Sequence, residues 1–361
     1  MSQRLDSVHR PQSIFLTGGT GMVGAQILKL LLARGYRDIR ALRRASSRMD
    51  LVSDVADQVT WIEGSLMNTA ALEEGMHQAD WVIHAAALIA HGRSRSPDLY
   101  RVNIDGTANV VNAALAANVA KLLHVSSIAV FTRTGGTQHI DETTEWQRTP
   151  YTTEYGYSKY RAEMEVWRGN AEGLSTAIIN PSIVLGAGFW ENGSSSMFRR
   201  IWEGLRVYPV GVNGYVDVRD VACMAVLRLE HELGPERMIL NAANLTFEDL
   251  FARTSRLLDR RPPTIRLPPW ATEIAWRVMR PVGWLSGKSP AITRETARTT
   301  RCLLYFDNSR SLQVPGFTYT GIDQTLTDIA SIVCRTAPGR YQPQTLPFLP
   351  HHLDHSSVSG G

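Results

Sequence analysis

A glycine-rich turn close to the start of the chain is the feature that most restricts its fold. Residues 13–24 read Ser-Ile-Phe-Leu-Thr-Gly-Gly-Thr-Gly-Met-Val-Gly. The apolar run Ile14–Leu16 predicts a strand, and the pattern of Met22–Ala33 predicts a helix directly after the turn. Glycines spaced three apart let the backbone turn sharply and approach a ligand, and a helix N-terminus offers N–H groups to a pyrophosphate. The turn therefore indicates dinucleotide binding, with a plain strand-to-helix turn as the alternative.

Alternating strand and helix patterns continue through the first half of the chain. Strands separated by helices of this length favour parallel βαβ units in one sheet. We therefore predict an α/β fold: a Rossmann-like doubly wound parallel sheet with a smaller C-terminal substrate lobe, and ligands at the carboxyl ends of the strands. The further predicted strands are Asp38–Leu42, Val59–Ile62, Asp80–His84, Leu122–Ser126 and Thr176–Ile179, and the main predicted helices are Asn103–Ala117 and Tyr155–Ala171.

The same pattern divides the chain into four parts. Residues 1–12 form a polar N-terminal tail that reads as neither a signal peptide nor a membrane anchor, and residues 13–186 form the NAD(P)-binding domain. Residues 187–337 form mainly the substrate-binding lobe, with part of 215–245 returning to the first domain. Prolines and a polar, glycine-ended sequence predict a disordered tail at 338–361.

Two segments of the second half allow more than one interpretation. The tail carries His351, His352 and His355, which offer metal ligands, but an unstructured polar tail is the favoured interpretation. The tryptophan-rich segment Trp270–Leu285 is predicted to be a helix of the substrate lobe that packs on the core. A surface that touches membranes or hydrophobic substrates is its alternative.

Composition excludes several classes of protein. The 361 residues are 43% hydrophobic and 20% charged, which is typical of a globular protein with a sizeable core. The net charge of +4 comes without a long basic run, so nucleic acid is not an expected partner. No uncharged apolar run approaches the ~20 residues of a transmembrane segment. Cys223, Cys302 and Cys334 are far apart and show no metal spacing; without a disulfide framework they fit a reducing cytosol and predict a cytoplasmic protein.

A tyrosine and a lysine four residues apart are candidates for acid–base chemistry. Tyr155 and Lys159 open a predicted helix and share one face of it. A phenol with a pKa near ~10 needs a nearby cation to exchange protons at neutral pH, and Lys159 is placed to be that cation. Ser127 follows the fifth predicted strand, where its hydroxyl would donate a hydrogen bond to the reacting oxygen. A surface pair and a strand-capping serine are the alternatives.

Six motifs resemble those of the extended short-chain dehydrogenase/reductase superfamily, also called the NAD-dependent epimerase/dehydratase family, and they occur in the order that the family shows. The resemblance covers about residues 13–330. Within the family, the dihydroflavonol-reductase-like and 3β-hydroxysteroid-dehydrogenase-like branch is the most similar, through Val-Asp-Val-Arg-Asp-Val-Ala at 216–222 and Leu-Leu-Tyr-Phe-Asp-Asn-Ser at 303–309. The six motifs are Thr17–Gly24, Asp80–Ala87, Val102–Thr107, Ser126–Ser127, Tyr155–Lys159 and Asn180–Gly186.

The resemblance implies roles for individual residues. Ser127, Tyr155 and Lys159 would form the catalytic triad, and Lys159 would also bind the nicotinamide ribose. The glycine-rich turn would line the pyrophosphate, Pro181 and Ile183 would flank the nicotinamide, and a helix asparagine would order the site. The predicted cofactor-binding residues are Gly18, Thr20, Gly21, Met22, Val23, Gly24, Arg43, Arg44, Ser65, Leu66, Ala85, Ala86, Ala87, Asn103, Tyr155, Lys159, Pro181 and Ile183; no metal site is predicted.

The end of the second strand indicates which dinucleotide is bound. NAD selection needs an acidic residue about 20 positions after the glycine turn, to hold the ribose hydroxyls. Arg43 and Arg44 stand there instead, and a guanidinium pair would bind a 2′-phosphate. We therefore predict NADP(H) in preference to NAD(H), with a solvated basic loop as the alternative.

Two further positions qualify this prediction. Gly64-Ser65-Leu66 replaces the family's usual Gly-Asp-Leu/Ile, whose carboxylate receives the adenine amino group, so Ser65 would accept that hydrogen bond more weakly. His84, at the end of the fourth predicted strand, is expected to be a packed strand residue rather than a catalytic base.

The favoured function is an NADP(H)-dependent oxidoreductase. It would reduce a ketone or aldehyde, or oxidise a secondary alcohol, on a fairly apolar small molecule. The alternative is a nucleotide-sugar epimerase or dehydratase with tightly bound NAD, although Ile128-Ala129 follows the serine where a dehydratase needs acidic residues. A non-catalytic dinucleotide-sensing module is the third hypothesis, and the intact Tyr155 counts against it. The family also leads us to expect a homodimer.

Overall fold

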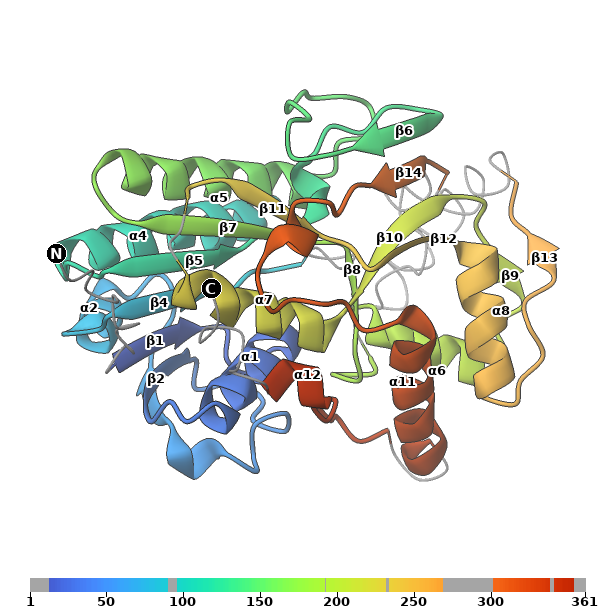
Figure 1. Cartoon of the computed structure of the whole chain (residues 1–361), viewed down its shortest axis with the longest axis horizontal. Helices are drawn as coiled ribbons and strands as arrows, with labels where there is room; N and C mark the ends of the chain where they lie inside the picture. Colours follow the sequence, from blue (N-terminus) through green and yellow to red (C-terminus); the bar gives the residue numbers. More distant parts are fainter. Residues whose placement is uncertain are drawn as a thin grey trace, which may run out of the picture.

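A seven-stranded parallel sheet forms the larger part of the molecule (Figure 1). The structure is a computed structural model, and it describes residues 13–89, 96–191, 193–231, 234–268, 301–337 and 341–353. The tail at 1–12 and the Trp270–Leu285 segment lie outside the described residues. The strand order is β11-β7-β5-β4-β1-β2-β3. The strands are β1 (Ser13–Thr17), β2 (Asp38–Arg43), β3 (Thr60–Glu63), β4 (Trp81–His84), β5 (Lys121–Val125), β7 (Thr176–Pro181) and β11 (Arg237–Leu240).

Helices cover both faces of this sheet, which confirms the predicted Rossmann-like fold. Figure 1 shows α4 and α5 on one side, and α1 and α7 on the other. Apolar side chains of the strands divide between the two faces, because alternate residues of a strand point in opposite directions: Leu16 packs with the α1 and α7 residues, and Phe15 with the α2, α4 and α5 residues. The helices are α1 (Met22–Ala33), α2 (Thr69–Met76), α4 (Gly106–Ala116), α5 (Glu154–Ala171) and α7 (Val218–Glu230).

A second sheet lies beyond the carboxyl ends of the large one. Its order is β12-β10-β14-β6, and β8 also pairs with β10. Because β6 and β8 come from the first 186 residues, the chain boundary predicted there does not separate the two sheets. The strands are β6 (Thr137–Ile140), β8 (Ile183–Leu185), β10 (Val212–Asp217), β12 (Ala243–Thr246) and β14 (Leu303–Phe306). Around them lie α6 (Ser195–Trp202), α8 (Phe247–Leu257), α11 (Ile322–Thr336) and the small pair β9 (Val207–Tyr208) and β13 (Ile265–Arg266).

The helix predicted to begin at Asn103 begins earlier. α3 (Ser96–Tyr100) leads into a π-helical turn, η2 (Arg101–Asp105), which continues as α4. Pro97 lies in the first turn of α3, where a missing N–H breaks no helical hydrogen bond. The π-helical turn contains Asn103, and such turns are frequent at functional sites.

Part of the predicted disordered tail is folded, so that prediction is wrong for residues 341–353. The segment ends in α12 (Pro350–Leu353) and runs back against the first helix of the large domain. Gln26 Nε2 donates to Leu346 O at 2.8 Å, and Arg34 Nη2 donates to His352 O at 2.9 Å. Gln26 of α1 and Arg34, the C-cap of that helix, are both buried, and the returning segment supplies acceptors for their donors. Residues 338–340 and 354–361, with His355, lie outside the described residues.

Candidate functional site

The glycine-rich turn between β1 and α1 is shaped by close backbone approach. Gly18 has φ +78°, and a Cβ there would lie 2.6 Å from Ala86 N, so only glycine lets the segment after β4 come this near. A Cβ on Gly24 would lie 2.1 Å from Gly18 O, so the second glycine lets α1 pack on the turn. Gly21 is the N-cap of α1 and offers no capping side chain. The first N–H groups of α1 are therefore available to an anion.

The neighbours of this turn lie where the sequence predicts cofactor contacts. Thr20, Met22 and Val23 are half-buried beside it. The Met22 side chain turns toward the smaller lobe, where Ser195 Oγ lies 3.5 Å from its sulfur. Among the residues of the segment after β4, Ala85 and Ala86 are half-buried and Ala87 is exposed. The uncapped N-terminus of α1 and the short side chains beside the turn are the features that a dinucleotide pyrophosphate requires, so the described residues fit the group.

The arginines at the end of β2 lie near the surface. Arg43 is 34% exposed, and its guanidinium is 3.9 Å from the carboxylate of Glu63, its register partner on β3. Its Nε is buried without a hydrogen-bond partner among the described residues. Arg44 is exposed. The pair therefore has donor capacity beyond what the loose contact with Glu63 uses.

Ser65 and Leu66 form the turn after β3. Ser65 Oγ accepts a hydrogen bond from Met67 N at 3.3 Å, so the hydroxyl is already engaged within the turn. Leu66 is buried, and its carbonyl oxygen accepts from Asn109 Nδ2 of α4 at 2.9 Å. A carboxylate would offer more acceptor positions than this hydroxyl.

Three polar residues stand side by side across the middle of the sheet, at the ends of β1, β4 and β5. Thr17 is the register partner of His84, and His84 is the register partner of His124. Thr17 Oγ1 lies 2.7 Å from His84 Nδ1, and Thr107 Oγ1 lies 3.0 Å from His84 Nε2. Because the Thr107 hydroxyl donates to Asn103 O at 2.6 Å, His84 Nε2 carries a hydrogen and His84 Nδ1 accepts.

These contacts make His84 a structural residue. Its side chain is fully buried, and burial together with the Lys159 charge lowers its pKa to about 3. It therefore stays neutral, with both ring nitrogens occupied, and has no lone pair for substrate. The expectation of a packed strand residue is confirmed.

Asn103 joins the segment after β4 to helix α5. Its Oδ1 accepts from Leu88 N at 2.7 Å, and its Nδ2 donates to Leu88 O and to Ser158 Oγ, each at 2.9 Å. The side chain is buried, and its three hydrogen bonds all serve this link. Asn103 thus holds the wall of the site against the helix that carries Tyr155 and Lys159.

Ser127, Tyr155 and Lys159 come together at the junction of β5 and α5. Ser127 follows β5, and its Oγ accepts from Ala129 N at 3.2 Å, which leaves the hydroxyl hydrogen free to donate. The Ser127 hydroxyl lies beside the Tyr155 side chain. Burial raises the pKa of Tyr155 to about 12, and the neighbouring Ser127 hydroxyl opposes that shift.

Lys159 is the most deeply buried of the three. Only 1% of it is exposed, and Nζ donates to Val125 O at 2.9 Å and lies 3.0 Å from His124 Nε2. Burial lowers its pKa to about 8, while the charge of Glu163 raises it. Lys159 therefore titrates much closer to neutrality than an exposed lysine.

Asn180, Glu163 and His124 belong to the site but were not predicted. Asn180 Nδ2 donates to Glu163 Oε1 at 2.7 Å and to Ser127 O at 3.3 Å, and Arg237 Nε donates to Glu163 Oε2 at 2.7 Å. The signals were present: Glu163 lies four residues after Lys159, and His124 interrupts the apolar run Leu122–Val125. Next to Asn180 on the chain, Pro181 is buried and Ile183 half-buried.

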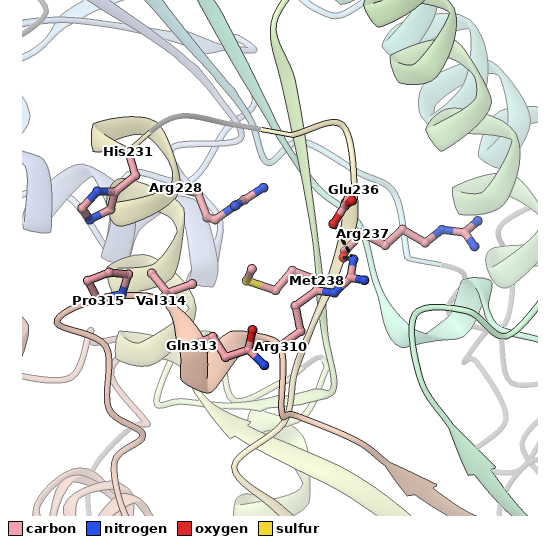
Figure 2. A pocket seen from close by; sticks show the side chains of 9 residues that line it. All are labelled: Arg228, His231, Glu236, Arg237, Met238, Arg310, Gln313, Val314 and Pro315. Atoms are coloured by element: carbon pink, nitrogen blue, oxygen red, sulfur yellow. Dashed lines mark hydrogen bonds and ion pairs between the residues drawn. The ribbon is translucent and has the colours of Figure 1, made fainter.

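A cavity of about 460 Å³ lies away from these residues, beside β11 and the end of α7 (Figure 2). Its arginines already hold other groups: Arg310 Nη1 pairs with Glu236 at 2.7 Å, and Arg228 Nη2 donates to Gly234 O at 3.2 Å. Figure 2 shows Arg237 pointing away from the cavity. None of the predicted site residues is among the residues that line it, which are Arg228, His231, Glu236, Arg237, Met238, Arg310, Gln313, Val314 and Pro315.

The histidines of the returning segment gather around Asp220 of α7. His352 Nε2 lies 2.9 Å from Asp220 Oδ1, and its Nδ1 accepts from Leu349 N at 3.1 Å. An imidazole whose Nδ1 accepts carries its hydrogen on Nε2, so His352 donates to Asp220 and offers no lone pair to a metal. Asp220 also accepts from Thr320 N and Oγ1. The cluster is a hydrogen-bonded fastening of the segment.

Taken together, the fold and the site define a class of protein: a nicotinamide-dinucleotide-dependent α/β oxidoreductase. A model of the NAD dependent epimerase/dehydratase family matches residues 14–243, and the chain belongs to that family. It is an NAD(P)-dependent oxidoreductase of the extended short-chain type. Among the described residues, no helix is both long and apolar enough to cross a membrane.

Three comparisons refine this placement. A Synechocystis protein with the provisional name dihydroflavonol 4-reductase is 30% identical over 326 residues, which cover 87% of this chain and 92% of that protein. Cinnamoyl-CoA reductase 1 of Petunia hybrida is 24% identical and covers 84% of this chain and 93% of its own. The crystal structure of gox2253 superposes with a TM-score of 0.76 at 28% identity, covering 91% of this chain and 99% of that one.

Proposed function

We propose that the protein is an NADP(H)-dependent ketone or aldehyde reductase that uses Ser127, Tyr155 and Lys159. The observation that carries the proposal is that these three side chains gather at the carboxyl end of β5, with Ser127 beside Tyr155 and Lys159 Nζ bonded to Val125 O. When bound, the nicotinamide dinucleotide supplies or accepts the hydride. All other steps belong to side chains of the chain itself.

Tyr155 handles the proton. In reduction, its hydroxyl donates a proton to the oxygen of the carbonyl, while Ser127 donates a hydrogen bond to that oxygen and orients it. A phenol with a pKa of about 12 releases its proton slowly unless positive charge favours the phenolate. Lys159, one helical turn away, supplies that charge while it is protonated.

Arg43 and Arg44 support a preference for NADP(H). Two guanidinium groups at the end of β2 favour a 2′-phosphate, and no carboxylate occupies the end of that strand. Glu63 competes for Arg43, but the 3.9 Å contact is long and partly exposed. Such a contact is weak compared with a bidentate phosphate pair.

An aromatic or otherwise apolar carbonyl compound is the proposed substrate class. The names of the dihydroflavonol 4-reductase and cinnamoyl-CoA reductase relatives support it. The cysteines of the described residues, Cys223, Cys302 and Cys334, form no disulfide, which supports the cytoplasm as the place of action. An epimerase with retained NAD is the second candidate, and the family description favours it equally. It predicts no net change in nicotinamide absorbance.

The test is Tyr155→Phe, with Tyr157→Phe as the matched control. Tyr157 stands two residues further along α5 and packs on the rings of Tyr100 and Trp146. We expect the first variant to lose about 10²–10⁴-fold in kcat on a panel of aryl ketones with NADPH, and to bind NADPH normally. The control should stay near wild type. Full turnover by Tyr155→Phe would overturn the triad, and absence of net NADPH oxidation in the wild type would favour the epimerase.

A further inference from the structure

The ammonium group of Lys159 is hydrogen-bonded to strand β5. Two of its three hydrogens have acceptors there: Val125 O at 2.9 Å and His124 Nε2 at 3.0 Å. One N–H remains for the open side of the site, where substrate and ribose would lie. We propose that His124 is a positioning residue that fixes the ammonium of Lys159 for the reaction; the proposal rests on the function proposed above for Lys159.

The tautomer of His124 follows from this contact. A protonated lysine only donates, so His124 Nε2 must accept, and the ring hydrogen sits on Nδ1. His124 Nδ1 is buried and has no hydrogen-bond partner among the described residues. Buried N–H groups without an acceptor are rare and destabilising. A leucine would fill this strand position without leaving such a group, so stability alone does not account for the histidine.

Burial and the charge of Lys159 keep His124 neutral. His84 of β4 lies against it with ring centroids 5.0 Å apart, and His84 is itself neutral. Burial, Lys159 and His84 together hold the pKa of His124 well below its usual range. From β7, the register partner is the apolar Ile178. His124 therefore remains an acceptor for Lys159 throughout the pH range in which enzymes work.

The positive charge of Lys159 depends on two further groups. Glu163 of the same helix raises the pKa of Lys159, and burial lowers it to about 8. Glu163 is held by Asn180 of β7 and Arg237 of β11. Removal of the His124 acceptor leaves the buried ammonium with one hydrogen bond fewer, which favours the neutral amine. The pKa of Lys159 then falls further.

The direct experiment is a pH titration of the lysine side chains by NMR. The sequence holds only four lysines, Lys29, Lys121, Lys159 and Lys288, so ε-¹³C-lysine labelling gives a spectrum that can be assigned by substitution. His124→Leu removes the acceptor. His124→Gln keeps one, because the glutamine side-chain oxygen takes the place of His124 Nε2. We expect the Lys159 midpoint to fall by about one pH unit in His124→Leu and to stay near wild type in His124→Gln.

Lys121 is an internal reference in the same sample. Its Nζ donates to Leu229 O and His231 O, so its midpoint should not move. If His124→Leu does not fold, His124→Met provides a second apolar variant. An unchanged Lys159 midpoint in the folded apolar variant would overturn the proposal. Because this titration needs no substrate, its result is independent of whether Tyr155→Phe loses activity.

The kinetic consequence separates positioning from mere packing. Ketone reduction requires protonated Lys159, so its rate is lost as pH rises through the Lys159 midpoint. In His124→Leu this loss should begin about one pH unit lower, with a larger fall in kcat than change in KM for NADPH, and His124→Gln should restore the profile. A variant that is merely less stable, with an unshifted pH profile, would contradict the positioning role.

Discussion

The two ends of the ligand-binding edge are held by different kinds of contact. At the β1–β2 end, the missing side chains of Gly18 and Gly24 bring backbone segments together, and the arginines lie near the surface. At the β5–α5 end, Lys159 and its neighbours are buried and fixed by side-chain hydrogen bonds from several strands. The first end is therefore set by local backbone geometry, and the second by tertiary contacts. The cofactor end should therefore keep its fold when its arginines are substituted, whereas substitutions at the buried catalytic end should disturb the surrounding structure.

The largest expected effect at the cofactor end comes from Arg43→Ala combined with Arg44→Ala. Each charge-assisted hydrogen bond to a phosphate contributes about 1.5–3 kcal/mol, so we expect NADPH affinity to fall about 10–100-fold or more. NADH affinity should change little, since it lacks the 2′-phosphate. Fluorescence titration with both cofactors measures the difference. Equal affinities for NADPH and NADH in the wild type would remove the proposed selectivity.

Arg48→Ala is the matched control for that pair. Arg48 lies in the same loop, but its guanidinium donates to Asp50 and stacks on the ring of Phe189. Its removal should leave the ratio of the two affinities unchanged. A loss of NADPH selectivity in Arg48→Ala would mean that general positive charge, rather than a built phosphate site, decides the cofactor.

An effect of intermediate size, on stability, is expected where the C-terminal segment packs against α1 and α7. His352→Ala removes the hydrogen bond to Asp220 and the acceptor for Leu349 N, and the Asp220 carboxylate stays buried with one hydrogen bond fewer. We expect the free energy of unfolding to fall by about 1–3 kcal/mol, with kcat unchanged. Urea unfolding measures the change. His351→Ala should cost less, because the His351 side chain is only half-buried. If kcat of His352→Ala also fell, the packing of the C-terminal segment would be coupled to the catalytic end of the ligand-binding edge.

The smallest expected effect is at Ser65. Ser65→Asp restores the carboxylate that the family uses for the adenine amino group, and a net hydrogen bond is worth about 0.5–1.5 kcal/mol. Affinity for NADPH and NADH should therefore rise together, by roughly 2–10-fold. Ser65→Ala should be nearly neutral, because Ser65 Oγ is engaged by Met67 N. If only one of the two cofactors bound more tightly, the new carboxylate would not be acting at the adenine amino group, which both cofactors share.

The sequence allowed much of the cofactor end to be predicted, because its structure depends on nearby residues. Helix α1 begins at Met22 and ends at Ala33 as predicted, since a glycine N-cap precedes it and Gly35 follows in a left-handed conformation. The meeting of Ser127 with Tyr155 was also expected from motif order. His124, by contrast, contacts Lys159 across 35 residues, and no local pattern shows that a strand histidine will face a helix lysine.

The C-terminal segment shows the same limit more strongly. Its prolines and histidines are typical of a disordered tail, and periodicity offers no signal for residues 341–353. The segment is ordered by acceptors that it offers to Gln26 and Arg34, more than 300 residues earlier. Buried donors on α1 were visible in the sequence only as polar residues in an apolar helix. Their partners depend on the completed fold.

The packing of the C-terminal segment against α1 has a consequence for folding and for the design of fragments. The hydrogen bond from Gln26 to Leu346 spans 320 residues, so helix α1, which presents its N-terminus to the cofactor, reaches its final packing only after nearly the whole chain has been synthesised. A fragment that stops after β11 contains every strand of the large sheet, yet leaves Gln26 and Arg34 without these acceptors. We therefore expect the dinucleotide-binding half to be unstable as a separate domain, although its sheet topology is complete.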